Sequence, residues 1–293
     1  MKRLLSLLTA SVALLFMACS DDQQSPKPQP EDPTPEQPTP DVPAPEQGAQ
    51  VGDYFYADGS YSTLLDEGKE CIGLIFWLGD PTTTDPTLKR EHPECTHGLV
   101  MALHHNSSAW QSLFWKSEAR VSAWLEQQPE LAYELPLLSN QEASIGKICG
   151  YNNTRAIELY NAAPENSTWP VEAVQFAHEY SQRVEAPAST SGWYIPSPKE
   201  LSLMCSGECE GNIYDLSTKM IERRTLLNER LKALSGINSL PGNLHWSSAE
   251  FDDQGVDAVV GWQVAISVLF SEGDVSVSFK DYGSAFVRPV LAF

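Results

Sequence analysis

Two tryptophans and three carboxylates near the end of the chain could together bind a ligand. They are Trp246, Glu250, Asp252, Asp253 and Trp262. Tryptophan faces stack on sugar rings, and carboxylates bind hydroxyl groups or calcium. The alternative is that both tryptophans are core residues on either side of a loop, and the residue pattern alone favours that alternative. These five residues are nevertheless the candidate ligand-binding face that the sequence offers.

The segment Glu91–His97 (EHPECTH) is the densest group of metal-ligand side chains. Zinc needs three or four ligands that converge tetrahedrally. The spacing His-x-x-Cys-x-His matches no standard zinc signature, and ligands that flank the start of a strand are expected to diverge. The sequence therefore predicts no metal and no cofactor, and a loop whose Cys and His side chains pack or form hydrogen bonds.

Sequence motifs of common enzymes are missing from this chain. There is no Gly-x-Ser-x-Gly elbow, no phosphate-binding glycine loop and no His-Glu-x-x-His motif. A glycosidase with two carboxylates distant in sequence stays open as a minor alternative. We predict that the protein is not an enzyme.

The N-terminal residues have the layout of a signal peptide. Lys2 and Arg3 precede an apolar run from Leu4 to Ala18, and Cys19 follows. The run is too short for a spanning helix, which needs about 20 apolar residues. A small residue before a cysteine looks like a bacterial lipoprotein processing site, so residues 1–18 are the predicted signal peptide and Cys19 the predicted lipidation site. An ordinary secretory signal is the alternative.

Residues 19–50 are predicted to be a disordered tether. Nine of residues 20–50 are proline and none is aromatic, so this segment buries too little apolar surface to fold. Residues 51–293 remain as one large folded domain or two small ones, and we assign them to one. Without Lys2 and Arg3 the net charge is near −22, from 17 basic and 39 acidic residues. Such a surface argues against nucleic acid and against docking on anionic lipid.

Cysteine pairing cannot be deduced from the sequence. The cysteines after Cys19 are odd in number, and an exported domain permits disulfides. Cys205 and Cys209 could bridge a small loop, and a fully reduced set is the alternative. The five candidates are Cys71, Cys95, Cys149, Cys205 and Cys209.

Strands at both ends and helices in the middle predict an α+β fold. The predicted strands are 53–60, 71–79, 98–103, 244–248, 256–270, 274–280 and 285–293. The predicted helices are 153–163, 170–184, a helix that begins with the capping box Ser197–Glu200, and 216–234. We expect the first and last strands to pair.

Several motifs, in order along the chain, resemble a large group of Bacteroidetes surface lipoproteins. They are GDYFYADGSYST (52–63), CIGLIFWLGDP (71–81), THGLVMAL (96–103), GYNNTRAI (150–157), WYIPSPKEL (193–201), HWSSAEF (245–251) and VRPVLAF (287–293). The folded part of that group is similar to the C-terminal domain of the Legionella collagen-like adhesin, which is related to the C-type lectin fold. The resemblance implies a C-type lectin-like domain with helical insertions. Ser20, Asp21 and Asp22 also resemble the surface-export signal of such lipoproteins.

The resemblance implies roles by position. The WYIPS segment at Trp193 is structural, with Ile195 in place of the usual Leu. The stretch from Trp246 to Glu250 matches a WSSSE-type motif, and the loops after it form the ligand surface in lectin-like folds. Residues 250–282 are therefore the implied binding face, although Val264–Phe270 is apolar enough to be a core strand. The formylglycine-generating oxidases share the broad fold but use late cysteines that this chain lacks, and no calcium-binding Glu-Pro-Asn triplet occurs.

Together these features predict an outer-membrane lipoprotein that faces the cell exterior. We expect it to bind a glycan or protein ligand, with the membrane contacted only through the lipid anchor. The alternative is an accessory or tip subunit of a surface appendage, with other appendage proteins as partners.

Overall fold

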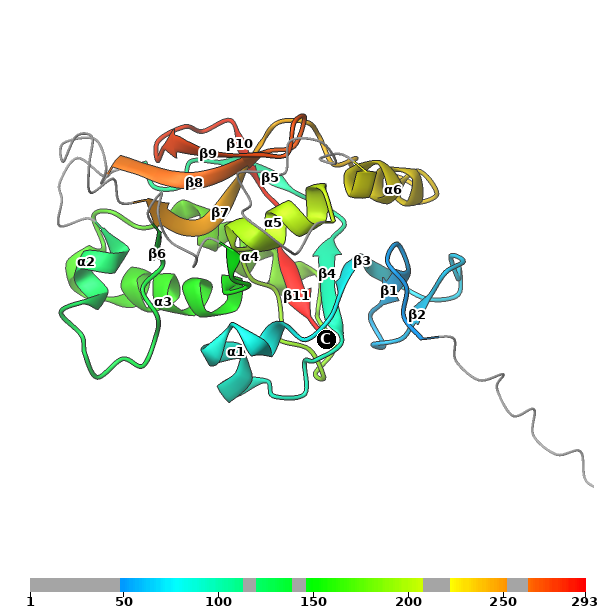
Figure 1. Ribbon diagram of the computed structural model, residues 1–293, viewed down its shortest axis with the longest axis horizontal. Helices are drawn as coiled ribbons and strands as arrows, with labels where there is room; N and C mark the ends of the chain where they lie inside the picture. Colours follow the sequence, from blue (N-terminus) through cyan, green and yellow to red (C-terminus); the bar gives the residue numbers. More distant parts are fainter. Residues whose placement is uncertain (1–47, 113–119, 139–145, 208–221, 252–262) are drawn as a thin grey trace, which may run out of the picture. The chain divides into compact units, whose positions relative to one another are not determined.

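Two β-sheets and the helices packed on them make up the described part of the chain (Figure 1). The computed structural model describes residues 48–112, 120–138, 146–207, 222–251 and 263–293. The chain divides into the units Met1–Glu46 and Gln47–Phe293, and the description below concerns the second. Several sequence predictions lie outside the described residues: the signal peptide, Cys19, nearly all of the tether, Cys209, Asp252, Asp253 and Trp262.

Sheet A has the strand order β11-β4-β3-β1-β2. Its strands are antiparallel, and β11 at one edge pairs with β4. The predicted pairing of the first and last strands is thus wrong, because β3 and β4 separate β1 from β11 within the sheet. The bounds are β1 Tyr54–Tyr56, β2 Tyr61–Ser62, β3 Cys71–Leu78, β4 Gly98–Ala102 and β11 Val290–Ala292.

Sheet B has the order β5-β10-β7-β8-β9, and β6 also pairs with β7. The β7-β8-β9 part is an antiparallel meander, whereas β10 and β6 run parallel to β7. The bounds are β5 Asn106–Ser108, β6 Leu137–Leu138, β7 Leu244–Phe251, β8 Val264–Leu269, β9 Asp274–Phe279 and β10 Ala285–Val287.

Helices occupy the middle of the chain, as predicted. The α-helices are α1 Pro86–Glu91, α2 Val121–Leu125, α3 Gly150–Ala162, α4 Glu172–Arg183, α5 Pro198–Cys205 and α6 Glu222–Leu231. Short 3₁₀ turns, η1 and η4, cover Pro81–Thr83 and Pro164–Asn166. No helix among the described residues is long and apolar enough to cross a membrane.

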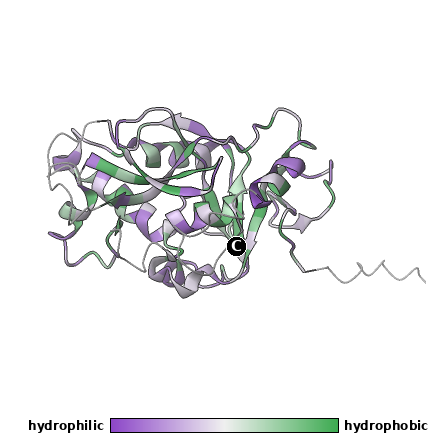
Figure 2. Ribbon diagram, turned by 45° about the horizontal axis from the view of Figure 1, so that its top comes forward, coloured by the Kyte–Doolittle hydropathy of each residue, from purple (hydrophilic) through white to green (hydrophobic). Residues whose placement is uncertain are grey.

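Sheet A is buried on both faces, which explains why its central strands read as continuous apolar runs. In β4, Leu99 and Met101 join a cluster with residues of α5 and α6, while Val100 and Ala102 join another with residues of α3 and α4. Gly73 of β3 lies so close to Val100 and the Met101 carbonyl that a Cβ there would collide with both. Figure 2 shows the hydrophobic residues gathered on these central strands.

The capping box predicted at Ser197 begins α5. The Ser197 hydroxyl accepts from the Glu200 amide at 3.4 Å, and the Ser197 amide donates to Glu200 Oε2 at 2.5 Å. Trp193 and Tyr194 just before it are buried, and Tyr194 forms a bridge with Val290 of β11. This segment therefore links α5 to the edge of sheet A.

Candidate functional site

Trp246 lies in the interior, contrary to the expectation of an open binding face. It is on β7, has no exposed surface and packs in the same cluster as Trp110. Its indole Nε1 donates to the Ser108 carbonyl of β5 at 2.9 Å, and Trp110 Nε1 donates to the Ser247 carbonyl at 2.9 Å. Trp246 is thus a core residue in this structure, which was the alternative interpretation of the sequence.

Glu250 is also buried, at the far end of β7, and forms an ion pair with Lys280. Lys280 Nζ lies 2.5 Å from Glu250 Oε1, and both side chains are at most 2% exposed. The Glu250 carboxylate also accepts from the amides of Val121 and Ser122 and from the Ser122 hydroxyl, at 2.8–3.1 Å. These donors come from the first turn of α2, where the free amides of a helix are found.

The surroundings of Glu250 keep it charged. Burial favours the neutral acid, but the Lys280 ammonium and the donors from Ser122 outweigh burial and lower the pKa of Glu250. Lys280 is held further by Gln111 Oε1 at 3.3 Å and lies 4.7 Å from the centre of a Trp110 ring. Glu250 therefore joins β7, α2 and the segment after β9, and it does not face a ligand.

Two further buried carboxylates, Glu200 and Asp85, lie at the start of α3. Glu200 accepts from the Gly150 amide at 3.1 Å and from the Tyr194 hydroxyl at 2.8 Å, while Asp85 accepts from the Asn152 amide at 2.9 Å. Burial raises the pKa of Glu200 to about 7 and the pKa of Asp85 to about 6. The predicted capping box at Ser197 already placed Glu200 at a helix start, whereas Asp85 was missed, although the Asp-Pro pair at the start of α1 was an available signal.

Raised carboxylate pKa values can mark an enzyme active site. Here Asp85 and Glu200 are at most 1% exposed, and their oxygens accept mainly from backbone amides at helix starts. Neither lines the surface pocket described next. Their geometry is that of helix caps.

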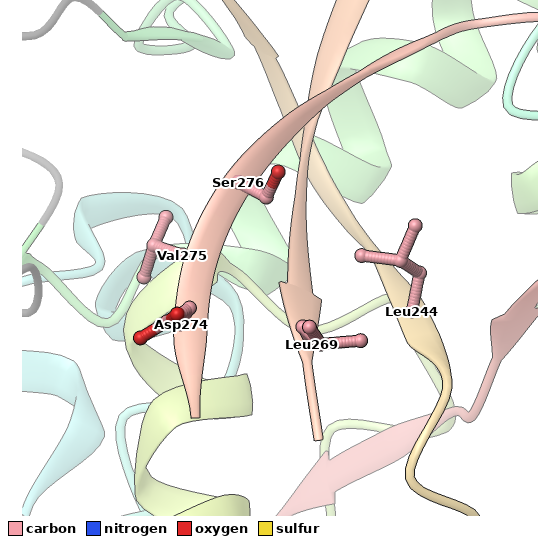
Figure 3. A pocket seen from close by; sticks show the side chains of 5 residues that line it. All are labelled: Leu244, Leu269, Asp274, Val275 and Ser276. Carbon is pink, nitrogen blue, oxygen red and sulfur yellow. The ribbon is translucent and has the colours of Figure 1, made fainter. Parts of the chain in front are cut away.

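An open pocket lies across the ends of β7, β8 and β9 (Figure 3). The strand register places Leu244 opposite Leu269, and Leu269 opposite Asp274, so these side chains share one face of sheet B. Ser276 and Val275 also line the pocket and point to opposite sides of β9. The lining combines three aliphatic side chains with the polar Asp274 and Ser276, and it contains no aromatic side chain that could stack on a sugar ring.

On the other face of β9, apolar side chains lie next to the buried core but are themselves exposed to solvent. Val277 lies opposite Ile266, and Phe279 lies opposite Val264. Ile266 and Val264 are buried in a cluster with β6 and β7 residues, yet Val277 is 45% and Phe279 is 53% exposed. Among the described strands, β9 pairs with β8 alone, so its outer edge is free there. A sheet edge with exposed apolar side chains is a site where another chain can add a strand.

Four of the cysteines lie among the described residues. Cys95, Cys149 and Cys205 are buried and Cys71 is partly buried, with no disulfide among them. Burial raises the pKa of Cys205 to about 12 and the pKa of Cys71 to about 11, so these thiols stay protonated and unreactive at neutral pH.

Comparisons with known proteins point to fimbriae. No family model matches the chain. The chain is 26% identical over 224 residues to the putative fimbrium tip subunit Fim1C of Bacteroides ovatus, a match that covers 69% of this chain and 39% of that protein. It is also similar to the crystal structure of a fimbrial protein from Bacteroides ovatus, with a TM-score of 0.63 and 24% identity over 84% of this chain and 49% of that one. The chain thus spans about two fifths of the curated relative and about half of the solved protein.

These comparisons establish the kind of fold. The α+β class predicted from the sequence agrees with the two sheets and their helices and with the fold of the solved fimbrial protein. The finer assignment to the C-type lectin-like fold is not tested by them and stays a prediction.

Proposed function

We propose that this protein is a subunit of a cell-surface fimbrium, located at its tip or accessory to it. The observation that carries the proposal is the fold, which is similar to a fimbrial protein over 84% of this chain. The sequence relative named as a putative fimbrium tip subunit supports the same function. The role is one of assembly and binding rather than catalysis, since the buried carboxylates act as helix caps and as an ion pair.

The proposed assembly surface is the edge of β9. A partner subunit would contribute an extended segment whose backbone continues sheet B and whose apolar side chains cover Val277 and Phe279. Main-chain hydrogen bonds supply affinity in such contacts, and alternate side chains supply specificity. The exposed Tyr282, which is 46% exposed and follows the same strand, would widen this apolar surface.

We further propose that the N-terminal segment attaches the protein to the outer membrane through a lipid on Cys19, with residues 20–50 as a spacer. A lipid anchor and a fimbrial role are compatible, because both place the folded unit outside the cell. A Cys19→Ala chain should leave the membrane fraction, and unchanged partition would contradict the anchor.

Adhesion to a host or microbial ligand is a second proposed activity of such a subunit. The contact cannot use Trp246 and Glu250 while they are buried as they are here. Asp252, Asp253 and Trp262 lie outside the described residues and remain the proposed ligand face. The pocket at Leu244 and Leu269 has no aromatic side chain in its lining, which supports a protein ligand over a glycan.

Filament incorporation tests the proposed function. Tagged protein would be expressed in fimbriated cells, and sheared filaments would be probed for the tag by sedimentation and by immunogold microscopy. We expect wild-type protein in the filament fraction and a loss of at least tenfold for the double variant Val277→Lys/Phe279→Lys, because charges on an edge block strand addition.

The control is Leu64→Lys, which places one lysine at another exposed apolar residue, 79% exposed and outside β9. This variant should enter filaments as the wild type does. Wild-type protein that never accompanies filaments would contradict the fimbrial function. Equal incorporation of the double variant would contradict the assembly surface.

A further inference from the structure

The loop between α1 and β4 brings three different metal-ligand side chains together. Atoms of His92, Glu94 and Cys95 that can bind a metal all lie within 4.8 Å of one another. The position of this segment at the start of a strand predicted that its ligand side chains would diverge. A tight turn explains why they converge instead, since the Cys95 amide donates to the His92 carbonyl at 3.1 Å and the Thr96 amide donates to the Glu94 carbonyl at 2.8 Å.

We propose that His92, Glu94 and Cys95 form a binding site for Zn²⁺. The set offers one nitrogen, one oxygen and one sulfur, which suits zinc and excludes magnesium and calcium, since those ions prefer oxygen ligands alone. Three protein ligands leave the fourth tetrahedral position for water. Nothing in the proposed fimbrial function requires this site, so each of the two proposals can be tested independently of the other.

The distances suit a small tetrahedral ion. Zinc bonds of about 2.0–2.3 Å place tetrahedral ligand atoms roughly 3.3–3.7 Å apart. His92 Nδ1 and Glu94 Oε1 are already 3.6 Å apart. Cys95 Sγ makes a long contact of 3.8 Å with the Ser189 carbonyl, and its side chain is fully buried in the core cluster, which fixes the inner ligand of the set.

A second layer of hydrogen bonds sets the tautomer of His92. His92 Nε2 lies 3.1 Å from the Tyr151 hydroxyl, and that hydroxyl donates to Glu91 Oε2 at 2.8 Å. Because the Tyr151 proton is given to Glu91, the Tyr151 oxygen accepts from Nε2–H of His92. Nδ1 is then left with its lone pair on the side of Glu94. Metal-bound histidines in proteins are oriented in this way by a carboxylate or another acceptor behind the ring.

Access and charge also suit a cation. The Glu94 side chain is 52% exposed and the His92 side chain is 26% exposed, so an ion can enter from solvent, while the Cys95 thiol forms the buried floor. Metal binding would displace the Cys95 proton to solvent, and the resulting thiolate and the Glu94 carboxylate would neutralise the ion. The bound ion would hold the loop between α1 and β4 closed.

The experiment uses the purified full chain, metal-free, titrated with Co²⁺ and then with Zn²⁺. Cobalt bound to a thiolate gives a near-ultraviolet charge-transfer band, and Zn²⁺ should displace it at one equivalent. We expect His92→Gln to weaken binding at least tenfold. Tyr151→Phe should weaken it by roughly 10-fold or more, because it removes the orienting bond.

Two matched controls make the test specific. His97→Gln changes an exposed histidine of the same loop that is not in the cluster, and Cys71→Ser removes another thiol; both should bind as the wild type does. Cys95→Ser changes a buried residue, so the folding of this variant would be checked by circular dichroism. If Cys95→Ser unfolds, the test depends on His92→Gln, because the His92 side chain is partly exposed. Absence of a one-equivalent thiolate band, or a band that persists in His92→Gln, would overturn the proposal.

Discussion

Lys280 Nζ lies 2.5 Å from Glu250 Oε1, and both side chains are withdrawn from solvent. This pair connects the segment that follows β9 to the end of β7, and the same carboxylate caps α2 through Ser122. Glu250, one of the three carboxylates that the sequence offered for ligand binding, thus holds three elements of the interior together. Its partner lies 30 residues away along the chain, and the helix start lies 128 residues away.

Removing Lys280 should destabilise the fold strongly. Lys280→Met leaves the Glu250 carboxylate buried without its counter-ion, and breaking a buried pair in this way costs about 3–5 kcal/mol. The double variant Lys280→Met/Glu250→Gln should recover part of that loss, because no unpaired charge remains. Denaturant unfolding followed by circular dichroism would measure all three proteins.

The control for this prediction is Lys232→Met. Lys232 pairs with Glu229 at 2.6 Å, but both side chains are at least 60% exposed. Surface ion pairs contribute about 0–1 kcal/mol to the free energy of unfolding, so Lys232→Met should lower that free energy by no more than this. A loss at Lys280 no larger than the loss at Lys232 would show that the buried pair does not stabilise the fold.

Glu200 should make the protein less stable as pH rises toward neutrality. Burial raises the pKa of Glu200 from 4.5 to about 7. The unfolded chain releases this proton near pH 4.5 and the folded protein near pH 7, so between these values the folded state binds more protons. The contribution of Glu200 to the free energy of unfolding should therefore fall by about 3 kcal/mol across this window.

The variant Glu200→Gln isolates that effect. An amide oxygen can still accept from the Ser197 and Gly150 amides, and the amide has no proton to lose, so the decline in stability between pH 6 and 7 should flatten. The same substitution at the exposed Glu272 should leave the slope of the wild type unchanged. The measurement is the free energy of unfolding at several pH values for all three proteins. If Glu200→Gln shows the same slope of free energy against pH as the wild type, Glu200 is not the source of the decline.

Trp246→Ala should behave as a core mutation. The substitution opens a cavity beside Trp110 and removes the bond to the Ser108 carbonyl, which together cost about 3–5 kcal/mol. Trp124→Ala should cost less, because Trp124 is partly exposed and its indole bonds to the exposed Glu165. Thermal unfolding would rank the two, and a fully stable Trp246→Ala protein would contradict the core position.

The double variant Val277→Lys/Phe279→Lys should remain folded. Both side chains are about half exposed, and surface substitutions usually change stability by no more than about 0.5 kcal/mol each. We therefore expect a melting temperature close to that of the wild type together with the loss of filament incorporation. A large drop in melting temperature would mean that the variant fails by unfolding and not by losing a contact.

Local patterns in the sequence were sufficient to predict most of the described elements. The apolar runs of β3 and β4, the periodic faces of α3 and α4 and the capping box of α5 each depend on residues within a few positions of one another. Their boundaries shifted by a few residues, because helix and strand ends depend on caps and bulges. The α+β class followed from the order of these elements.

Only the tertiary structure decided which polar and aromatic residues face inward. A strand pattern shows that two faces alternate, but the face that is covered depends on partners from distant parts of the chain. Glu250 is buried because Ser122 and Lys280 approach it, and Trp246 is buried because Trp110 and Ser108 do. His92 is oriented by Tyr151, which lies 59 residues away, and the turn from His92 to Thr96 brings Glu94 and Cys95 beside it, so the spacing of these ligands did not by itself predict that they converge.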